Sequence, residues 1–377
     1  MIAASQPIQR PASARLMVLD SSGRISDQLR SDLVSFLYPA DLVIANDAAT
    51  LPASLAGTHL ATGRTVEIRL AGRRSLAADD VHRFAAIVFG SGDFHTRTED
   101  RPHPPHLSPG DQLQLGPLNA TIDRLLGHPR LIAVRFDGFA DEIWAGIAHH
   151  GHPIQYSHVP TPLAMWDVWT PIAGSPGAFE PPSAGFALDW ALLQQMRTRG
   201  IAFATITHAA GISSTGDPEL DGRLPFDEPY RIPVTTAQAI EGAKSRGGRI
   251  VAVGTTVVRA LEHAARNGSV RPGDGMATQR IGAHTSLSVV DVLLSGTHEP
   301  GTTHYDLLRA FTDEATLNRV TAELNARRYH THEFGDSVLI SRSAASATEK
   351  EEHWRQTRIP TESHELADRT FDIATLT

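Results

Sequence analysis

The chain has 377 residues and no cysteine. That absence excludes disulfide bonds, thiolate zinc sites, iron–sulfur clusters and a cysteine nucleophile. Nowhere do eighteen or more apolar residues follow one another, so we expect no membrane-spanning segment. The first residues, MIAASQPIQRPASARLMVLD, lack a basic start followed by an apolar run. We therefore expect no secretory signal and a cytoplasmic location.

Two phosphate-binding signatures are also missing. The sequence has no G-x-x-x-x-G-K-[ST], and no G-x-G-x-x-G between a strand and a helix. These absences argue against a phosphate-loop NTPase and a nicotinamide dehydrogenase. The formal net charge of −8 argues against a protein whose main work is gripping a nucleic-acid backbone, although it leaves room for a local basic face.

Nineteen histidines invite a search for a metal site. Some of them gather at residues 149–152 and at residues 330–332, but no HExxH is present, because His332-Glu333 is followed by Phe-Gly-Asp. On one strand, His150 and His152 would face the same side. Because no third ligand accompanies them, we predict that the protein holds no metal.

The pattern of apolar residues predicts two kinds of structure in the chain. Residues 63–158 hold the short alternating runs TVEIRL, AAIVFG, LIAVRF and EIWAGIAH between loops rich in Gly, Pro and His, which predicts several antiparallel strands in an inserted β domain. Helical and strand patterns alternate after about residue 160, so residues 1–62 and 159–340 together predict an α/β main domain. The polar, charged segment 341–377 is predicted to be a loosely ordered or surface-wrapped tail.

Several elements of the main domain are predicted individually. The runs RLMVLD and DLVIAN read as strands, as does IAFATIT. Helical spacing predicts a helix over Phe186–Arg199, closed by Gly200. A second helix is expected from Thr235, where Gln238 has the spacing of a capping box.

The stretch RIVAVGTTVVRALEHAARNG predicts a strand over Arg249–Val253, a turn over Gly254–Thr256 and a helix from about Val257. In open α/β sheets, ligands lie at the carboxyl ends of strands, beside helix N-termini. Thr255 and Thr256 would present hydroxyls and backbone N–H groups at such a place. The alternative, that one threonine only caps the helix, remains open on spacing alone.

Other polar residues also stand at predicted strand or helix ends. Ser183 can cap the helix expected at Phe186, and Gly185 permits close approach of a ligand to the backbone. Asp291 follows the apolar run LSVV, and Gly335-Asp336 precedes the run VLI. Their repeated placement at strand ends indicates a ligand site at one edge of the sheet.

Together these stretches resemble the S-adenosylmethionine:tRNA ribosyltransferase-isomerase family of queuosine biosynthesis. The resemblance runs from about Arg15 to Ile340, and GTTVVRALE is its strongest part. Its anchors are DLVIANDAATLPASLAG (Asp41–Gly57), PPSAGF (Pro181–Phe186), DEPYRIP (Asp227–Pro233), AVGTTVVRALE (Ala252–Glu262), VVDVLLSGTHEP (Val289–Pro300) and FGDSVLI (Phe334–Ile340).

The resemblance implies a fold and a reaction. It implies a barrel-like α/β main domain with a small β-barrel inserted near the N-terminus, in a monomer. It implies S-adenosylmethionine as a ribosyl donor and no metal. The ribosyl carbons would pass to an aminomethyl-deazaguanine base in a tRNA anticodon and rearrange to an epoxycyclopentane, with adenine and methionine released.

The resemblance also implies roles for residues at matching positions. The candidates for proton transfer are His208, His298, Asp291 and Glu228. The candidates for holding the donor are Ser183, Ala184, Gly185, Gly254, Thr255, Thr256 and Arg259. The candidates for holding the acceptor are Asn46, Asp47, Thr302, Thr303 and Asp336.

The chain departs from the family pattern at several places, where two arginines, a lysine and two histidines are replaced. Cationic side chains are what a phosphate backbone would contact. Three interpretations stay open: transfer to tRNA, transfer to a small-molecule acceptor or other chemistry on S-adenosylmethionine, and binding without turnover. The departures lie at Asp47-Ala48-Ala49, Pro52-Ala53-Ser54, Ala187, Ile212–Gly216, Phe226 and Gly296–Thr303.

Overall fold

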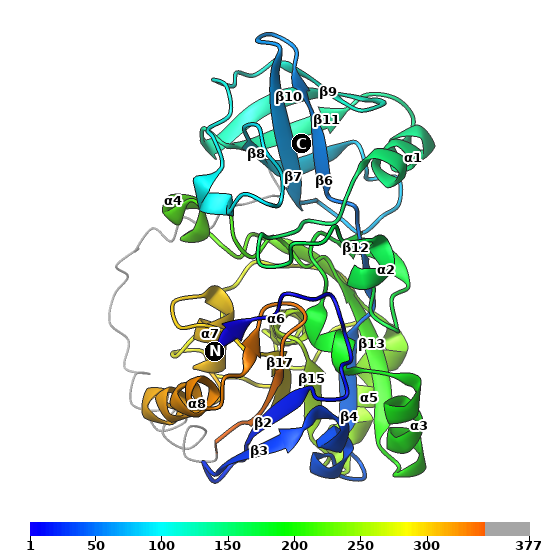
Figure 1. Ribbon diagram of the computed structural model, residues 1–377. Coiled ribbons are helices and arrows are strands. Elements are labelled where there is room, and N and C mark those ends of the chain that lie inside the picture. Colours follow the sequence, from blue (N-terminus) through cyan, green and yellow to red (C-terminus); the bar gives the residue numbers. More distant parts are fainter. Residues whose placement is uncertain (344–377) are drawn as a thin grey trace, which may run out of the picture.

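The computed structural model describes residues 1–343, and these form a β-barrel above an α/β unit (Figure 1). Apart from its first three residues, the predicted tail over 341–377 lies outside the described residues. The prediction of an α/β main domain with an inserted β-barrel is confirmed. Within residues 1–343, no helix combines the length and apolar character that crossing a bilayer requires.

A nine-stranded sheet forms the centre of the α/β unit. Four neighbouring strands, β13, β4, β15 and β17, run parallel, and the flanking strands make the sheet mixed. The sheet has two ends, β16 and β3, instead of closing on itself as a barrel-like arrangement would. The order is β16 (Gly273–Ala277), β14 (Glu228–Ile232), β13 (Ala202–His208), β4 (Leu42–Asn46), β15 (Ile250–Val253), β17 (Val292–Gly296), β19 (Ser337–Ser341), β2 (Arg15–Leu19) and β3 (Ile25–Leu29).

Helices cover both faces of this sheet. Ile44 and Ala252 face one apolar cluster, while their neighbours Val43 and Val251 face another, as the alternation of side chains along a strand requires. Because the central strands are buried on both faces, they read as continuous apolar runs. The first cluster includes residues of α5 (Val234–Ser245), α6 (Thr255–Ala264), α7 (Thr303–Leu308) and α8 (Glu314–Ala326), and the second includes residues of η1 (Arg30–Phe36) and α3 (Trp190–Thr198).

The inserted unit is a closed six-stranded barrel with its own apolar interior. Its first strand, β6, lies before residue 63, so the barrel begins earlier than the expected insertion. Helix α1 (Ala140–His150) packs on it through Gly146, where a Cβ would come within 2.3 Å of Leu118. The strands are β6 (Ser54–His59), β7 (Arg64–Gly72), β8 (Arg83–Phe89), β9 (Gln112–Leu115), β10 (Leu118–His128) and β11 (Leu131–Phe136).

Short elements complete the described chain. Two small parallel pairs join distant segments, β1 with β18 and β12 with β5. The short elements are β1 (Ile2–Ala3), β18 (His330–Thr331), β5 (Ala48–Thr50), β12 (Ser175–Ala178), α2 (Met165–Val168), α4 (Pro218–Asp221), η2 (Thr98–Asp100) and η3 (Ser183–Ala187).

Two predicted helix starts are wrong. Helix α3 begins at Trp190, because Asp189 caps it by accepting the N–H of Leu192 at 2.6 Å. The predicted start at Phe186 instead lies in η3, and Ser183 caps neither element. Helix α5 begins at Val234 after Pro233, with no side-chain cap, so the expected capping box at Thr235 is absent.

Candidate functional site

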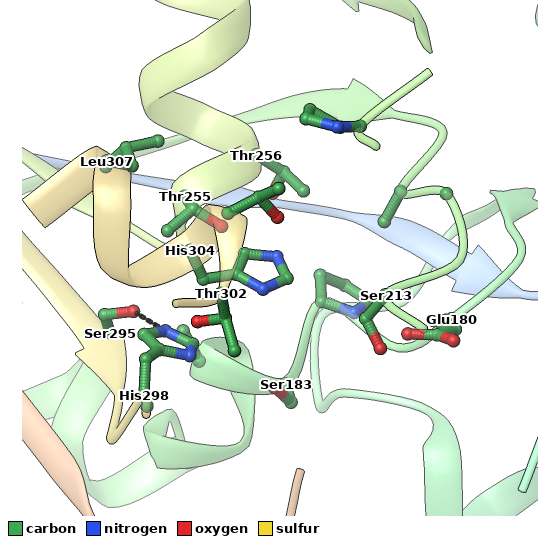
Figure 2. A pocket seen from close by; sticks show the side chains of 18 of the residues that line it. Glu180, Ser183, Ser213, Thr255, Thr256, Ser295, His298, Thr302, His304 and Leu307 are labelled. Atoms are coloured by element: carbon green, nitrogen blue, oxygen red, sulfur yellow. Dashed lines mark hydrogen bonds between the residues drawn. The ribbon is translucent and has the colours of Figure 1, made fainter. Parts of the chain in front are cut away.

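The carboxyl ends of the four parallel strands meet at one edge of the sheet. Strand β4 ends there at Asn46, β13 at His208 and β17 at Gly296, and β15 runs into Gly254. Over this edge lies a cavity of about 560 Å³ (Figure 2). The fold therefore places a hollow of ligand size where α/β proteins bind ligands.

Six carboxylates line the cavity, against two arginines. Three of the six, Glu99, Glu299 and Asp306, are exposed at its margin, while Glu180 and Glu228 are buried. Arg259 is held by protein groups, as described below. The cavity is thus predominantly acidic. The carboxylates are Glu99, Glu180, Glu228, Glu299, Asp306 and Glu333, and the arginines are Arg259 and Arg280.

The Gly-Thr-Thr turn forms one wall of the cavity, and helix α6 begins two residues earlier than predicted, at Thr255. Gly254 has a φ of 98°, in the left-handed region that favours glycine. No side chain caps the helix, so the alternative that a threonine only finishes the helix end is not what the structure shows. Thr256 Oγ1 instead accepts a hydrogen bond from Asn46 Nδ2 at 3.4 Å, and both threonines face the hollow (Figure 2).

A buried ion pair joins Glu228 to Arg259 below the turn. Arg259 also donates to the carbonyls of Phe226, Ala277 and Gln279, and Glu228 accepts the N–H of Gly211 at 2.6 Å. Burial raises the pKa of Glu228, and the charge of Arg259 offsets only part of that effect. Arg259 is therefore committed to holding Glu228 and the neighbouring chain.

His208 lies behind this pair, fully buried, and does not line the cavity. Its Nε2 is 3.4 Å from Oε2 of Glu228, yet within the described residues neither ring nitrogen makes a hydrogen bond. Burial and then the charge of Arg259 hold the pKa of His208 well below its ordinary value, so its ring is neutral.

Two further neutral imidazoles, those of His298 and His304, line the cavity. The rings of His298 and His304 stack with centroids 5.0 Å apart, and His298 Nε2 lies 2.7 Å from the Ser295 hydroxyl. Burial lowers the pKa of His304 to about 4 and that of His298 well below its usual value. Both rings can exchange hydrogen bonds with a ligand without adding positive charge.

Glu180 faces them across the cavity, beside Ser213 (Figure 2). The Tyr156 hydroxyl donates to Glu180 Oε1 at 2.5 Å. Burial raises the pKa of Glu180 to about 7, with a further contribution from the charge of Glu333, although the bond from Tyr156 acts in the opposite direction. Sequence reasoning missed Glu180; the available signal was its position directly before PPSAGF.

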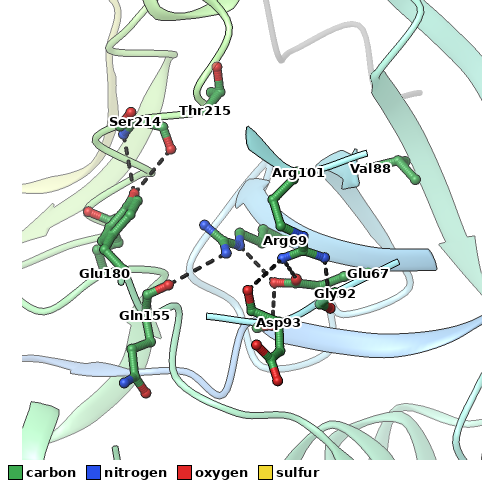
Figure 3. Close-up of polar contacts among 12 residues, drawn as sticks. Glu67, Arg69, Val88, Gly92, Asp93, Arg101, Gln155, Glu180, Ser214 and Thr215 are labelled. Atoms are coloured by element: carbon green, nitrogen blue, oxygen red, sulfur yellow. Dashed lines mark hydrogen bonds and ion pairs between the residues drawn. The ribbon is translucent and has the colours of Figure 1, made fainter. Parts of the chain in front are cut away.

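The barrel supports this wall through buried charges (Figure 3). Glu67 accepts from Arg69 Nε at 2.7 Å and from Arg101 Nη1 at 2.5 Å. Burial alone would raise the pKa of Glu67, but the two arginine charges outweigh it and lower that pKa. The Arg69 guanidinium also lies 5.6 Å from the centre of the Tyr156 ring. Tyr156, which donates to Glu180, is thus in contact with a buried arginine of the barrel.

Two acceptor candidates, Asn46 and Asp47, do not line the cavity. Asn46 is buried and bonds the backbone of His208, and Asp47 accepts from the Thr207 hydroxyl at 2.6 Å. Both side chains join the ends of β4 and β13. They support the strand ends beneath the cavity without lining it.

Asp291 is placed at the wrong edge of the sheet by the sequence prediction. Residues 287–290 are not a strand, and Asp291 instead precedes β17, so it stands at the amino end. There it accepts the N–H of Ile250 at 2.9 Å and pairs with Arg342 at 3.1 Å. This aspartate is a structural residue, and we withdraw it as a proton acceptor.

Asp336 and Gly185 also contact other parts of the chain and do not line the cavity. Asp336 is buried and accepts the N–H groups of Arg15 and His330 at 2.8 and 2.7 Å. A Cβ on Gly185 would come within 2.9 Å of Thr170, so this glycine permits close packing of the chain and not, as predicted, of a ligand.

The remaining predicted residues line the cavity together. Two of them also have local roles: Thr302 caps α7 by accepting the N–H of Tyr305, and Arg259 holds Glu228. No group of three or more histidine or acidic side chains suited to a metal ion is found within residues 1–343. The predicted residues at the cavity are Ser183, Ala184, Glu228, Gly254, Thr255, Thr256, Arg259, His298, Thr302 and Thr303.

A family model described as "Queuosine biosynthesis protein" matches residues 1–340. The chain belongs to this family. Among curated relatives, it is 30% identical to the S-adenosylmethionine:tRNA ribosyltransferase-isomerase of Thermosynechococcus vestitus over 92% of this chain and 94% of that one. It is 31% identical to the protein of the same name from Sorangium cellulosum, over 89% and 94% of the two chains.

A solved structure is also similar to the chain. It is the S-adenosylmethionine tRNA ribosyltransferase of Thermotoga maritima, with 23% identity, a TM-score of 0.48, and coverage of 90% of this chain and 96% of that one.

Proposed function

We propose that the protein is an S-adenosylmethionine-dependent ribosyltransferase-isomerase of the queuosine pathway, which transfers and isomerises the ribosyl group onto the deazaguanine base of tRNA. Membership of the family over residues 1–340 supports this activity. The observation that carries it is the cavity at the Gly-Thr-Thr turn, because it places the family's strongest motif against a hollow of ligand size. A tRNA substrate implies a cytoplasmic protein.

The acidic cavity suits the donor. S-adenosylmethionine carries a sulfonium and an amino group, both cationic, and buried carboxylates stabilise positive charge in a low-dielectric site. Thr255, Thr256 and the turn at Ser183-Ala184 supply hydroxyls and backbone groups at the helix start. No phosphate-binding lysine is needed, because the donor has no phosphate.

The reaction requires a proton acceptor and a stabilised leaving group. The sulfonium acidifies the ribose carbon bonded to it, so a carboxylate near that carbon can take its proton. Adenine leaves more readily when a hydrogen-bond donor stabilises its nitrogens. The neutral ring of His304, at the cavity wall opposite Glu180, can supply such a bond.

A small-molecule acceptor is the second candidate, and the charge of the cavity favours it. A phosphate backbone is normally contacted by cationic side chains. Six carboxylates line the hollow, and one of its two arginines is committed to Glu228. An amine-bearing small acceptor would match this lining without phosphate contacts.

One assay separates the candidates. The protein is incubated with S-adenosylmethionine, with and without tRNA that carries the aminomethyl-deazaguanine base, and adenine release is followed. Release that depends on tRNA supports the proposed function. Release that needs only a small deazaguanine supports the second candidate, and no release in either case leaves a binding protein without turnover.

A further inference from the structure

We propose that Glu180 is the general base that takes the proton from the ribose carbon bonded to sulfur, and that Tyr156 is the positioning residue that holds it. This inference rests on the proposed function. The carbon–hydrogen bond breaks, its electron pair stays on the carbon beside the sulfonium, and the proton forms an O–H bond on the Glu180 carboxylate.

The six carboxylates at the cavity differ in what surrounds them. Glu99, Glu299 and Asp306 are exposed at its margin, where water reduces their effect on a bound donor. Glu228 is paired with Arg259 through Oε2 and accepts the N–H of Gly211 through Oε1, so both of its oxygens are already engaged by protein donors. These four are poorly suited to accept a proton from carbon.

Glu333 is bonded to His158 at 3.0 Å, and that ring stacks on His332. Although burial acts to raise the pKa of Glu333, the bond and charge from His158 lower it overall, which weakens it as a base. Glu180 differs from both Glu228 and Glu333, because the bond to its Oε1 comes from a neutral phenol.

The geometry around Glu180 fixes the carboxylate against the cavity. Its side chain is buried, with 7% of its surface exposed, and it lies on the cavity wall beside Ser213 (Figure 2). The Tyr156 hydroxyl that donates to it also accepts the N–H of Ser214 at 3.3 Å. Tyr156 therefore ties the carboxylate to the loop that forms this wall.

The barrel holds Tyr156 in turn. Arg69, which is paired with Glu67 inside the barrel, lies against the Tyr156 ring and donates to the carbonyl of the preceding Gln155 at 3.5 Å (Figure 3). A base must be positioned within a fraction of an ångström to be effective. This chain of contacts gives the inserted barrel a direct part in positioning the base.

The pH dependence of adenine release tests the inference. A base with a pKa of about 7 makes kcat/KM for S-adenosylmethionine rise through neutral pH and level off above it. The Glu180→Gln variant is expected to lose about 10²–10⁴-fold in kcat/KM above neutral pH and to lose this limb. Glu323→Gln, on the surface of α8, is the matched control and should behave as wild type.

Tyr156→Phe separates positioning from a merely structural role. The Tyr156 bond lowers the pKa of Glu180, so its removal should move the rising limb to higher pH. A structural role would lower the rate at every pH without moving the limb. Thermal melting and calorimetric binding of S-adenosylmethionine check that each variant is folded.

The outcomes distinguish the two proposals. If the wild-type protein releases no adenine, the proposed function fails and this inference falls with it. If the wild-type protein turns over and a folded Glu180→Gln variant keeps at least a tenth of its rate with the same limb, only the inference is overturned. If the rising part of the pH profile of kcat/KM lies at the same pH in Tyr156→Phe as in wild type, the role of Tyr156 is overturned.

Discussion

The side-chain amide of Asn46 bonds both backbone groups of His208. Asn46 Nδ2 donates to the His208 carbonyl at 2.9 Å, and Oδ1 accepts the His208 N–H at 2.9 Å. The same amide reaches Ala48 N–H and the Thr256 hydroxyl. One buried side chain thus joins the ends of β4 and β13 to the turn that lines the cavity.

Replacing this amide should destabilise the protein. In Asn46→Ala, the buried N–H groups of His208 and Ala48 lose the acceptor that Asn46 supplies, which costs about 2–4 kcal/mol in the free energy of unfolding. Urea-induced unfolding measures the change. Asn267→Ala, at an exposed position after α6, should change that free energy by less than about 0.5 kcal/mol. Equal effects of the two substitutions would contradict the role assigned to Asn46.

The Arg259–Glu228 pair predicts a pH-dependent loss of stability. In Arg259→Met, Glu228 stays buried without its cation, so its pKa rises further above the ordinary value. A raised pKa gives stability that is present at low pH and is lost as the pH rises. We expect the variant to lose about 3–5 kcal/mol near pH 8 and much less near pH 4.

Two further variants make this test specific. Arg231→Met removes an exposed pair with Asp274 and should cost at most about 1 kcal/mol at any pH. Adding Glu228→Gln to Arg259→Met should make the loss of stability caused by Arg259→Met independent of pH. Denaturant unfolding at several pH values checks both, and a pH-independent loss in Arg259→Met would count against a buried charge as its cause.

Replacing Glu180 should raise the stability of the protein at high pH, whereas Arg259→Met lowers it. Its pKa of about 7 lies above the ordinary value of 4.5, so wild-type protein loses stability as the pH rises from 4.5 through 7. Glu180→Gln keeps the acceptor for Tyr156 and cannot ionise. It should unfold like wild type near pH 4.5 and be more stable by on the order of 3 kcal/mol above pH 8. Thermal melts at both pH values, with Glu323→Gln as control, decide the matter.

Thr256 predicts a modest effect on ligand affinity. Thr256→Val removes the hydroxyl at the start of α6 and keeps the side-chain shape, so loss of one hydrogen bond should weaken S-adenosylmethionine binding about 2–10-fold. Thr198→Val, at an exposed position of α3, should leave the affinity unchanged. Titration calorimetry compares the two, and an unchanged affinity in Thr256→Val would remove this hydroxyl from the donor site.

The elements that sequence predicted well are those specified by local pattern. The runs RLMVLD and DLVIAN became β2 and β4, and TVEIRL and LIAVRF became the barrel strands β7 and β11. The run EIWAGIAH, also predicted as a strand, instead lies in helix α1. Helix ends were less predictable, because they depend on single bonds. Asp189 moved the start of α3 from Phe186 to Trp190, and Thr236 donates to the Thr205 carbonyl where a cap at Thr235 was expected.

The candidate site depended on tertiary structure that the sequence pattern could not supply. Asp291 stands at a strand end, but at the amino end, because the apolar run LSVV before it is not a strand and β17 begins only after it. Glu180 was missed because its role arises from burial and from Tyr156, which lies 24 residues away in the chain. The Gly-Thr-Thr turn was found because its strand, turn and helix are contiguous.

Calorimetric titration of S-adenosylmethionine into the wild-type protein tests the central claim most directly, namely that the hollow beside Thr255 and Thr256 holds this sulfonium nucleoside. The claim predicts saturable binding at a single site. An absence of binding at millimolar ligand would contradict it.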